Sequence, residues 1–351
     1  MISLLSRIIP YISGLYTLPW ILVGFVFTNL LASIGKPERI DYVMKKIGLI
    51  ILYCFVPVLI FRIFLDTPIG KEELNFFSIA CVSICLMYSI ALLFAKMQIK
   101  RQKMNPSSSA IYLKTMLTNQ GRSSAFVGGA MLAIPGWGVD AAIYMAVVGL
   151  MLFAVVPYLL SWMAGKAHGM EREKVHLPWF LRFYPWFFIT FVIAAVILQK
   201  TTHISTRDMG DWGTVLRFYA AITIPAALYY VGSGMHIKDM RLGELKKLLG
   251  IEKDSETEHW QWVRQILFLT TVLTPLVFTA IFGTMLLFKL IPSTWFAVII
   301  INSVLPITGT NMFLIPYGLD KRATAHSVTW STIICVPIVV LLIEIFSLLA
   351  Y

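Results

Sequence analysis

Two segments of the chain combine amides, hydroxyl groups, glycine and proline within apolar surroundings. The first reads Asn119-Gln120-Gly121-Arg122-Ser123-Ser124 and continues to Gly128 and Gly129. The second has Asn302-Ser303 and then Pro306-Ile307-Thr308-Gly309-Thr310-Asn311. Proline removes a backbone donor and glycine lets another backbone approach closely, so each segment is expected to interrupt a helix. The N–H groups exposed at such a break attract anions, and freed carbonyl groups can coordinate cations.

These residues predict a polar binding site built from two interrupted helices. Its candidate members are Ser123, Ser124, Gly128, Gly129, Asn302, Pro306, Thr308, Thr310 and Asn311. The alternative is that Gly128, Gly129 and Gly309 only allow helices to pack tightly. The amides, hydroxyl groups and proline on the same segments favour the polar site.

Ionisable residues near these segments are candidates for charge compensation or ion coupling, because charge is costly inside a membrane. Arg122 could neutralise a bound anion, or it could reach the cytoplasmic headgroups from the first turns of its helix. Asp140 and Asp320 could bind a coupling cation or a proton, although capping of the next helix explains them better. Histidine has an unperturbed pKa close to physiological pH, so His326 could exchange protons, and an interfacial position explains it equally well.

The elements that must position these residues are membrane-spanning helices. Hydrophobic residues make up 58% of the 351 residues and charged residues 13%, and the mean hydropathy is +0.78. A soluble core cannot absorb that much apolar surface, so the fold class is expected to be all-α, a polytopic membrane protein. Apolar windows of about 20 residues predict about ten spans. They lie near residues 9–34, 47–65, 75–97, 115–138, 141–163, 178–199, 212–235, 263–289, 291–316 and 323–350.

The charged residues indicate topology rather than a nucleic-acid surface. The net charge is +11, but the basic residues form short clusters between apolar runs. The loops after the first, third, fifth and seventh predicted helices are richer in Lys and Arg than the loops between them. The positive-inside rule therefore predicts a multi-pass protein of the cell membrane with both termini outside. The N-terminal apolar stretch lacks a basic region and a cleavage site, so it is expected to be the first mature helix.

An internal repeat divides the chain. The segment Gly128–Pro135 aligns with Gly309–Pro316. After one deleted residue, Gly138–Asp140 aligns with Gly318–Asp320, and Val156-Pro157 aligns with Val336-Pro337. With an odd number of helices in each copy, the second copy enters the bilayer from the opposite side. We predict two inverted repeats of about five helices each, at 1–163 and 178–351, joined by a cytoplasmic linker at 164–177. Helices 4 and 9 would then cross near the bilayer midplane. The alternative is a duplicated packing motif without transport.

Longer strings point to a known family. They are Val56-Pro57-Val58-Leu59-Ile60-Phe61, Pro225-Ala226-Ala227-Leu228 with Gly232 and Gly234, and above all Pro306–Asn311, Tyr317–Asp320, Ala325–Val328 and Ser331-Thr332. In these strings the chain resembles the auxin efflux carrier family of permeases, which belongs to the superfamily of bile acid, arsenite and riboflavin transporters. The resemblance implies a scaffold domain, a core domain with crossed helices 4 and 9, and alternating-access transport of small organic anions. A homodimer through the scaffold helices would suit the family.

One departure from the family pattern supports alternative functions. Ser123 and Ala130 stand where family members usually carry asparagine and then proline. A membrane sensor or scaffold that kept the transporter fold without transport is therefore one alternative, and a sodium-coupled symporter of a larger amphipathic anion is another. The sequence has no phosphate loop, paired-histidine zinc site or nucleophile elbow, so we expect no enzyme activity. All four cysteines lie in apolar segments, so no cofactor or metal is expected beyond a coupling H⁺ or Na⁺.

Overall fold

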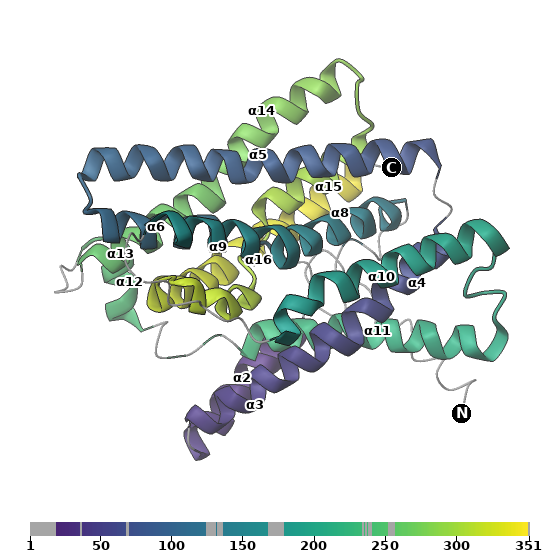
Figure 1. Cartoon of the computed structure of the whole chain (residues 1–351), viewed down its shortest axis with the longest axis horizontal. Coiled ribbons are helices and arrows are strands. Elements are labelled where there is room, and N and C mark those ends of the chain that lie inside the picture. The colour runs from purple at the N-terminus through teal and green to yellow at the C-terminus, as the bar shows by residue number, and fades with distance from the viewer. Residues whose placement is uncertain are drawn as a thin grey trace. The chain divides into compact units, whose positions relative to one another are not determined.

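The computed structural model is helical almost throughout (Figure 1). It describes residues 19–35, 37–67, 70–123, 131, 136–167, 179–233, 235, 237, 241–251 and 257–349. Within these ranges no strand is present, and two residues form an isolated bridge. The predicted all-α class is therefore confirmed for the described part of the chain.

The described helices overlap the predicted apolar ranges, although several bounds differ. In chain order they are α2 (Pro19–Ile34), α3 (Pro37–Ile50), α4 (Val56–Asp66), α5 (Lys71–Gln102), α6 (Pro106–Thr118), α8 (Gly138–Leu150), α9 (Val156–Ala167), α10 (Trp179–Thr202), α11 (Gly210–Ser233), α12 (Leu242–Leu248), α13 (Thr257–Phe268), α14 (Thr274–Leu287), α15 (Ser293–Val304) and α16 (Lys321–Leu349). A 3₁₀ helix, η8 (Gly309–Tyr317), follows α15.

Three short π-helical turns join neighbouring helices. They are η3 (Ile51–Phe55), η5 (Met151–Val155) and η7 (Leu269–Leu273), which link α3 to α4, α8 to α9 and α13 to α14. Each turn ends just before a proline, at Pro57, Pro157 and Pro275. Proline has no N–H and its ring crowds the carbonyl four residues earlier, so a wider turn accommodates it. The linked helices are therefore continuous across each proline.

Four of the described helices are long and apolar enough to cross a membrane, judged by length and composition. These are Tyr42–Asp66, Lys71–Gln102, His259–Leu287 and Lys321–Leu348. Shorter apolar helices occur at Pro19–Ile34, Gly138–Leu150, Ile189–Thr202 and Ser293–Val304. The fold is thus compatible with a membrane protein, and the number of spans and the inverted repeat remain predictions.

The predicted bounds of the fourth helix were wrong. An interrupted helix was expected near 115–138, and the described helix α6 begins nine residues earlier, at Pro106, and ends at Thr118. Pro106 stands in the first turn, where its missing N–H costs nothing. The hydropathy window missed this start because Ser107, Ser108 and Ser109 lower its average.

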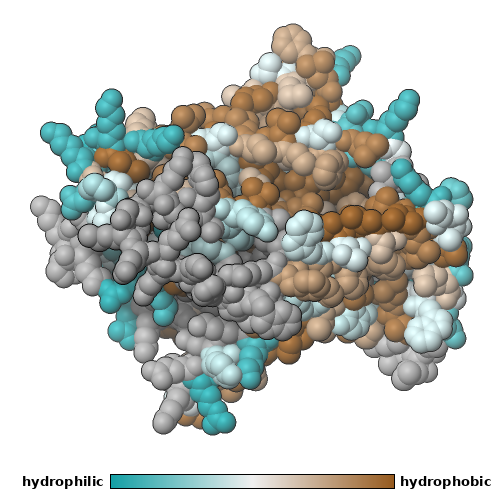
Figure 2. Space-filling view, in the orientation of Figure 1, coloured by the Kyte–Doolittle hydropathy of each residue, from teal (hydrophilic) through white to brown (hydrophobic). Residues whose placement is uncertain are grey.

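The surface of α5 illustrates how the apolar helices meet their surroundings. Its first turn carries Glu72 and Glu73, and its last turn carries Lys100 and Arg101. Between them, large apolar side chains such as Val82 and Leu93 are more than 60% exposed, at 63% and 68%. Figure 2 shows hydrophobic residues along the middle of this helix and hydrophilic residues gathered towards its ends. Such a surface is stable against lipid and unfavourable in water.

Residue contacts divide the chain into two units. Unit 1 takes the described residues of 1–79, 124–147 and 183–236, and unit 2 takes those of 80–123, 148–182 and 237–351. In unit 1, α2 packs along α11. The two backbones approach so closely at Gly232, against Ile21, that no side chain would fit there. This glycine therefore serves helix packing.

Unit 2 contains residues 119–123 of the first segment predicted to be interrupted, and all of the second. Within it, α13 packs on α16, α14 packs on α15, and α6 packs on α9. The candidate site is formed by the segment that follows α6 and the segment that follows α15.

Candidate functional site

Both helices stop where the sequence predicts an interruption. The segment that follows the end of α6 at Thr118 pairs with the segment that follows the end of α15 at Val304. The N–H of Ser123 donates to Pro306 O at 2.9 Å, and the N–H of Thr308 donates to Gly121 O at 2.9 Å. Arg122 and Ile307 thereby face each other in one antiparallel bridge. The two breaks thus satisfy some of each other's backbone groups, which a helix end would otherwise leave without partners.

Pro306 and α16 fix the second break. A residue before proline is driven towards extended backbone, and Leu305 has φ −54° and ψ 146°. The next N–H, that of Ile307, donates to Ser331 Oγ of α16 at 3.0 Å. The pairing of the two breaks is therefore also attached to α16.

The two paired breaks, residues 121–123 and 306–308, are called the crossing below. Buried polar side chains lie at and beside it. Gln120 and Asn311 are fully buried and Ser123 is 1% exposed. The side-chain oxygens of all three, and Nδ2 of Asn311, have no hydrogen-bond partner within the described ranges. Leaving such a group unsatisfied costs about 1–3 kcal/mol. A bound solute or water molecules at the crossing would remove that cost.

The structure brings together part of the predicted set. Ser123, Pro306 and Thr308 pair directly, and Asn311 touches the same place, since a Cβ atom on Gly121 would lie 2.6 Å from Asn311 Oδ1. Asn302 is buried in the last turn of α15, where its Nδ2 donates to Val298 O at 2.7 Å. Thr310 lies in η8. Ser124, Gly128 and Gly129 lie outside the described residues.

Two of the described basic residues are buried in unit 2. Arg122 is 1% exposed, so its side chain is enclosed by protein. Lys114 is 6% exposed, and its Nζ donates to Tyr317 O at 3.1 Å. Arg122 lies in the first break and Lys114 one turn before the end of α6, so both bring positive charge to a part of unit 2 that also contains the carboxylate of Asp320.

Asp320 caps α16, as the sequence favoured. Its Oδ1 accepts a hydrogen bond from the N–H of Ala323 at 2.6 Å, and its own N–H donates to Thr115 Oγ1 in α6 at 3.0 Å. Burial alone would raise the pKa of Asp320. The His259 side chain and the N–H groups of Ala323 and Arg322 outweigh burial and hold the pKa below its usual value.

Asp140, the counterpart of Asp320 in the predicted repeat, has a different position. It lies in the first turn of α8, inside the helix that it was expected to cap. This part of α8 belongs to unit 1, whereas Asp320 belongs to unit 2.

Sequence reasoning missed Lys114, His259 and Ser331 as members of this region. Lys114 precedes the predicted apolar window by one residue, and its partner is distant in sequence. Ser331 belongs to a string that resembles the family, and the sequence did not indicate it as a partner of the second break. The presence of a lysine directly next to an apolar window was the one sequence signal that could have been used.

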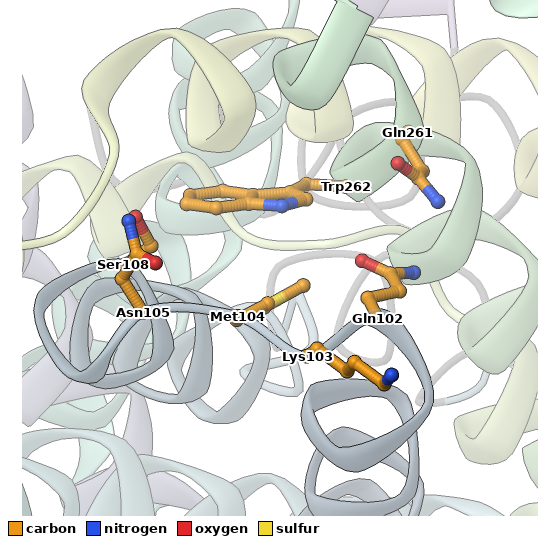
Figure 3. Close-up of a pocket in the computed structure, with 7 residues that line it drawn as sticks. All are labelled: Gln102, Lys103, Met104, Asn105, Ser108, Gln261 and Trp262. Carbon is orange, nitrogen blue, oxygen red and sulfur yellow. The ribbon is translucent and has the colours of Figure 1, made fainter.

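A pocket of about 350 Å³ lies at one end of unit 2. It is lined by Gln102, Lys103, Met104, Asn105, Ser108, Gln261 and Trp262 (Figure 3). The turn after α5 therefore lies beside the start of α13. These places follow the third and seventh predicted helices, whose loops are both predicted to be cytoplasmic. The side of the membrane on which they lie stays a prediction.

Within the described ranges, no group of three or more His, Cys, Asp or Glu side chains could hold a metal ion. Comparison with known proteins finds no family model that matches the chain and no matching curated protein. The resemblance to the auxin efflux carrier family remains a prediction from the quoted strings.

Proposed function

We propose that this protein is a secondary transporter of small organic anions such as carboxylates. The observation that supports this function is the pairing of two interrupted helices at Arg122 and Ile307, beside buried polar groups. Non-helical backbone at membrane depth is stable only when it is buried in protein or lines a wet cavity. In transporters built from inverted repeats, such breaks form the solute site.

The charge of this region favours an anion over a cation. Arg122 and Lys114 are both buried, and the sequence from residue 80 to residue 123 contains no Asp or Glu. A carboxylate would offset part of this charge and would accept hydrogen bonds from Asn311 Nδ2 and Ser123 Oγ. A cation would meet repulsion from both basic side chains.

The proposal includes a place and a mechanism. The protein would cross the cell membrane about ten times, in two inverted repeats with both termini outside. Its two halves would alternate between inward-open and outward-open states around the crossing. H⁺ or Na⁺ would be the coupling ion.

Flux measurements in proteoliposomes test this function. The purified protein should take up at least one member of a panel of short mono- and dicarboxylates in a saturable manner. Asn311→Ala should weaken the apparent affinity about tenfold or more, because a hydrogen bond to a charged group contributes about 1.5–3 kcal/mol. Thr284→Ala is the control, since the side chain of this exposed threonine donates to Ala280 O of its own helix.

Absence of flux for every carboxylate, with folded protein in the vesicles, would contradict the proposal. Binding of a carboxylate without any flux would instead favour the sensor without transport.

A further inference from the structure

Two histidines and an aspartate from different elements meet in unit 2. His259 lies in the first turn of α13, His326 lies in α16, and Asp320 precedes α16. Nε2 of His259 lies 3.3 Å from Nδ1 of His326, and Nδ1 of His259 lies 3.6 Å from Asp320 Oδ1. Trp260 borders the cluster, with its ring centroid 4.8 Å from that of His326.

The hydrogen-bond partners determine where the protons lie when both rings are neutral. Nδ1 of His326 lies 2.9 Å from Arg322 O. A carbonyl oxygen can only accept, so the proton of His326 is on Nδ1. Nε2 of His259 must then be the acceptor in its contact with His326. The proton of His259 is therefore on Nδ1, on the side of Asp320.

One further proton changes these contacts. The two unprotonated nitrogens of the pair are Nε2 of His259 and Nε2 of His326. A proton on Nε2 of His259 would face Nδ1–H of His326, so two donors would oppose each other and that contact would become repulsive. At the same time the positive ring of His259 would attract the Asp320 carboxylate more strongly. Protonation of His259 therefore weakens its contact with His326 and strengthens its contact with Asp320, which shifts the contact of α13 towards the N-terminal cap of α16.

We propose that His259, His326 and Asp320 form a proton-binding site that adjusts the crossing according to pH. The regulatory part of this inference rests on the proposed transport function, whereas the proton site itself does not.

The cluster is attached to the crossing by two routes. The N–H of Asp320 donates to Thr115 in α6, the helix that ends at the first break. On α16, Ser331 accepts from Ile307 at the second break. A movement of α16 relative to α13 would therefore reach both breaks.

The charged groups on the neighbouring elements either stabilise or destabilise a protonated histidine ring. Asp320 favours a positive ring, and the basic residues disfavour it. The basic residues are Lys321 and Arg322 on α16, Arg264 on α13, and Lys114 on α6. On α12, which packs on α13, Glu244 and Lys247 form an ion pair at 3.2 Å.

Tryptophan fluorescence tests the proton site without any transport. An imidazolium ring quenches a neighbouring indole more strongly than a neutral imidazole does. The purified protein in detergent is titrated from about pH 8 to about pH 5, the range in which histidine changes charge. Subtracting the titration of Trp260→Phe isolates the signal of Trp260. We expect this signal to fall on acidification.

Matched variants assign the transition. His259→Asn should abolish it, whereas His203→Asn should retain it, because His203 is exposed in the loop between α10 and α11 and has φ 53°, which asparagine tolerates. Asp320→Asn should move the midpoint to lower pH, since the carboxylate no longer favours the charged ring. If His259→Asn does not fold, the midpoint shift in Asp320→Asn is the test of the proton site.

A Trp260 signal that does not change with pH, or one that persists in His259→Asn, would overturn the proton site. In proteoliposomes, the pH profile of flux should flatten in His259→Asn and remain in His203→Asn. An unchanged pH profile of flux in His259→Asn would overturn the proposal that the proton site adjusts the crossing. A fluorescence transition without flux of any carboxylate would retain the proton site and refute the proposed transport.

Discussion

Asp320 joins several elements of unit 2 through a single residue. Its carboxylate caps α16 and faces His259 of α13, and its backbone N–H reaches Thr115 of α6. Burial works against the charged carboxylate. The contacts with His259 and with the N–H groups of Ala323 and Arg322 nevertheless hold its pKa below the usual value.

This lowered pKa predicts a pH dependence of stability. A carboxyl group with a folded-state pKa below its unfolded value of about 3.9 stabilises the fold above that pH. The stabilisation is lost as the pH falls through the lower, folded-state pKa. Asp320→Asn keeps a capping oxygen but removes the charge. Thermal unfolding between about pH 6 and about pH 3 should therefore depend less on pH in the variant, and equal slopes would contradict this account.

Residue types alone predicted part of the candidate site. Pro306, Thr308 and Asn311 stood out because proline, hydroxyl groups and amides are unusual within an apolar run. Lys114 and His259 did not, because their roles arise from contacts with Tyr317 and His326, 203 and 67 residues away along the chain. Sequence spacing contains no information on such contacts without the fold.

Among the elements, the break after α6 leaves little room for a side chain at Gly121. A Cβ atom there would lie 2.6 Å from Asn311 Oδ1 and 2.7 Å from Leu152 Cδ1. Gly309, at the start of η8, is the matched comparison, because a Cβ atom there has no described atom within 4 Å.

Gly121→Ala should therefore destabilise the protein by about 1–3 kcal/mol, the usual cost of overpacking. Gly309→Ala should change stability by much less. Thermal unfolding in detergent would compare the two variants. Equal melting temperatures would show that the contact between Gly121 and Asn311 is not tight.

Proline positions show which parts of an element the sequence can predict. Pro57, Pro157 and Pro275 follow π-helical turns, while α11 and α16 run through Pro225 and Pro337. The sequence aligns Val156-Pro157 with Val336-Pro337, yet their local helices differ. Hydropathy located these helices, but the path around each proline depends on packing that a window cannot describe.

For the whole molecule, apolar content and length identified a helical chain suited to a membrane. The predicted boundary between repeats, at 164–177, is a division of the sequence. The contact units are a different division, because residues 124–147 and 183–236 both belong to unit 1. Composition could predict the helices, whereas the units depend on which distant helices pack together.

The central claim is that the paired breaks form a solute site reached from water. A cysteine at Ser123 tests it directly, in a background where Cys54, Cys81, Cys85 and Cys335 are replaced. A charged, water-soluble thiol reagent should label this cysteine in membranes, and a transported carboxylate should slow the labelling at least threefold, as expected when most sites are occupied. Absence of labelling from either side, or a rate that no transported carboxylate changes, would contradict the claim.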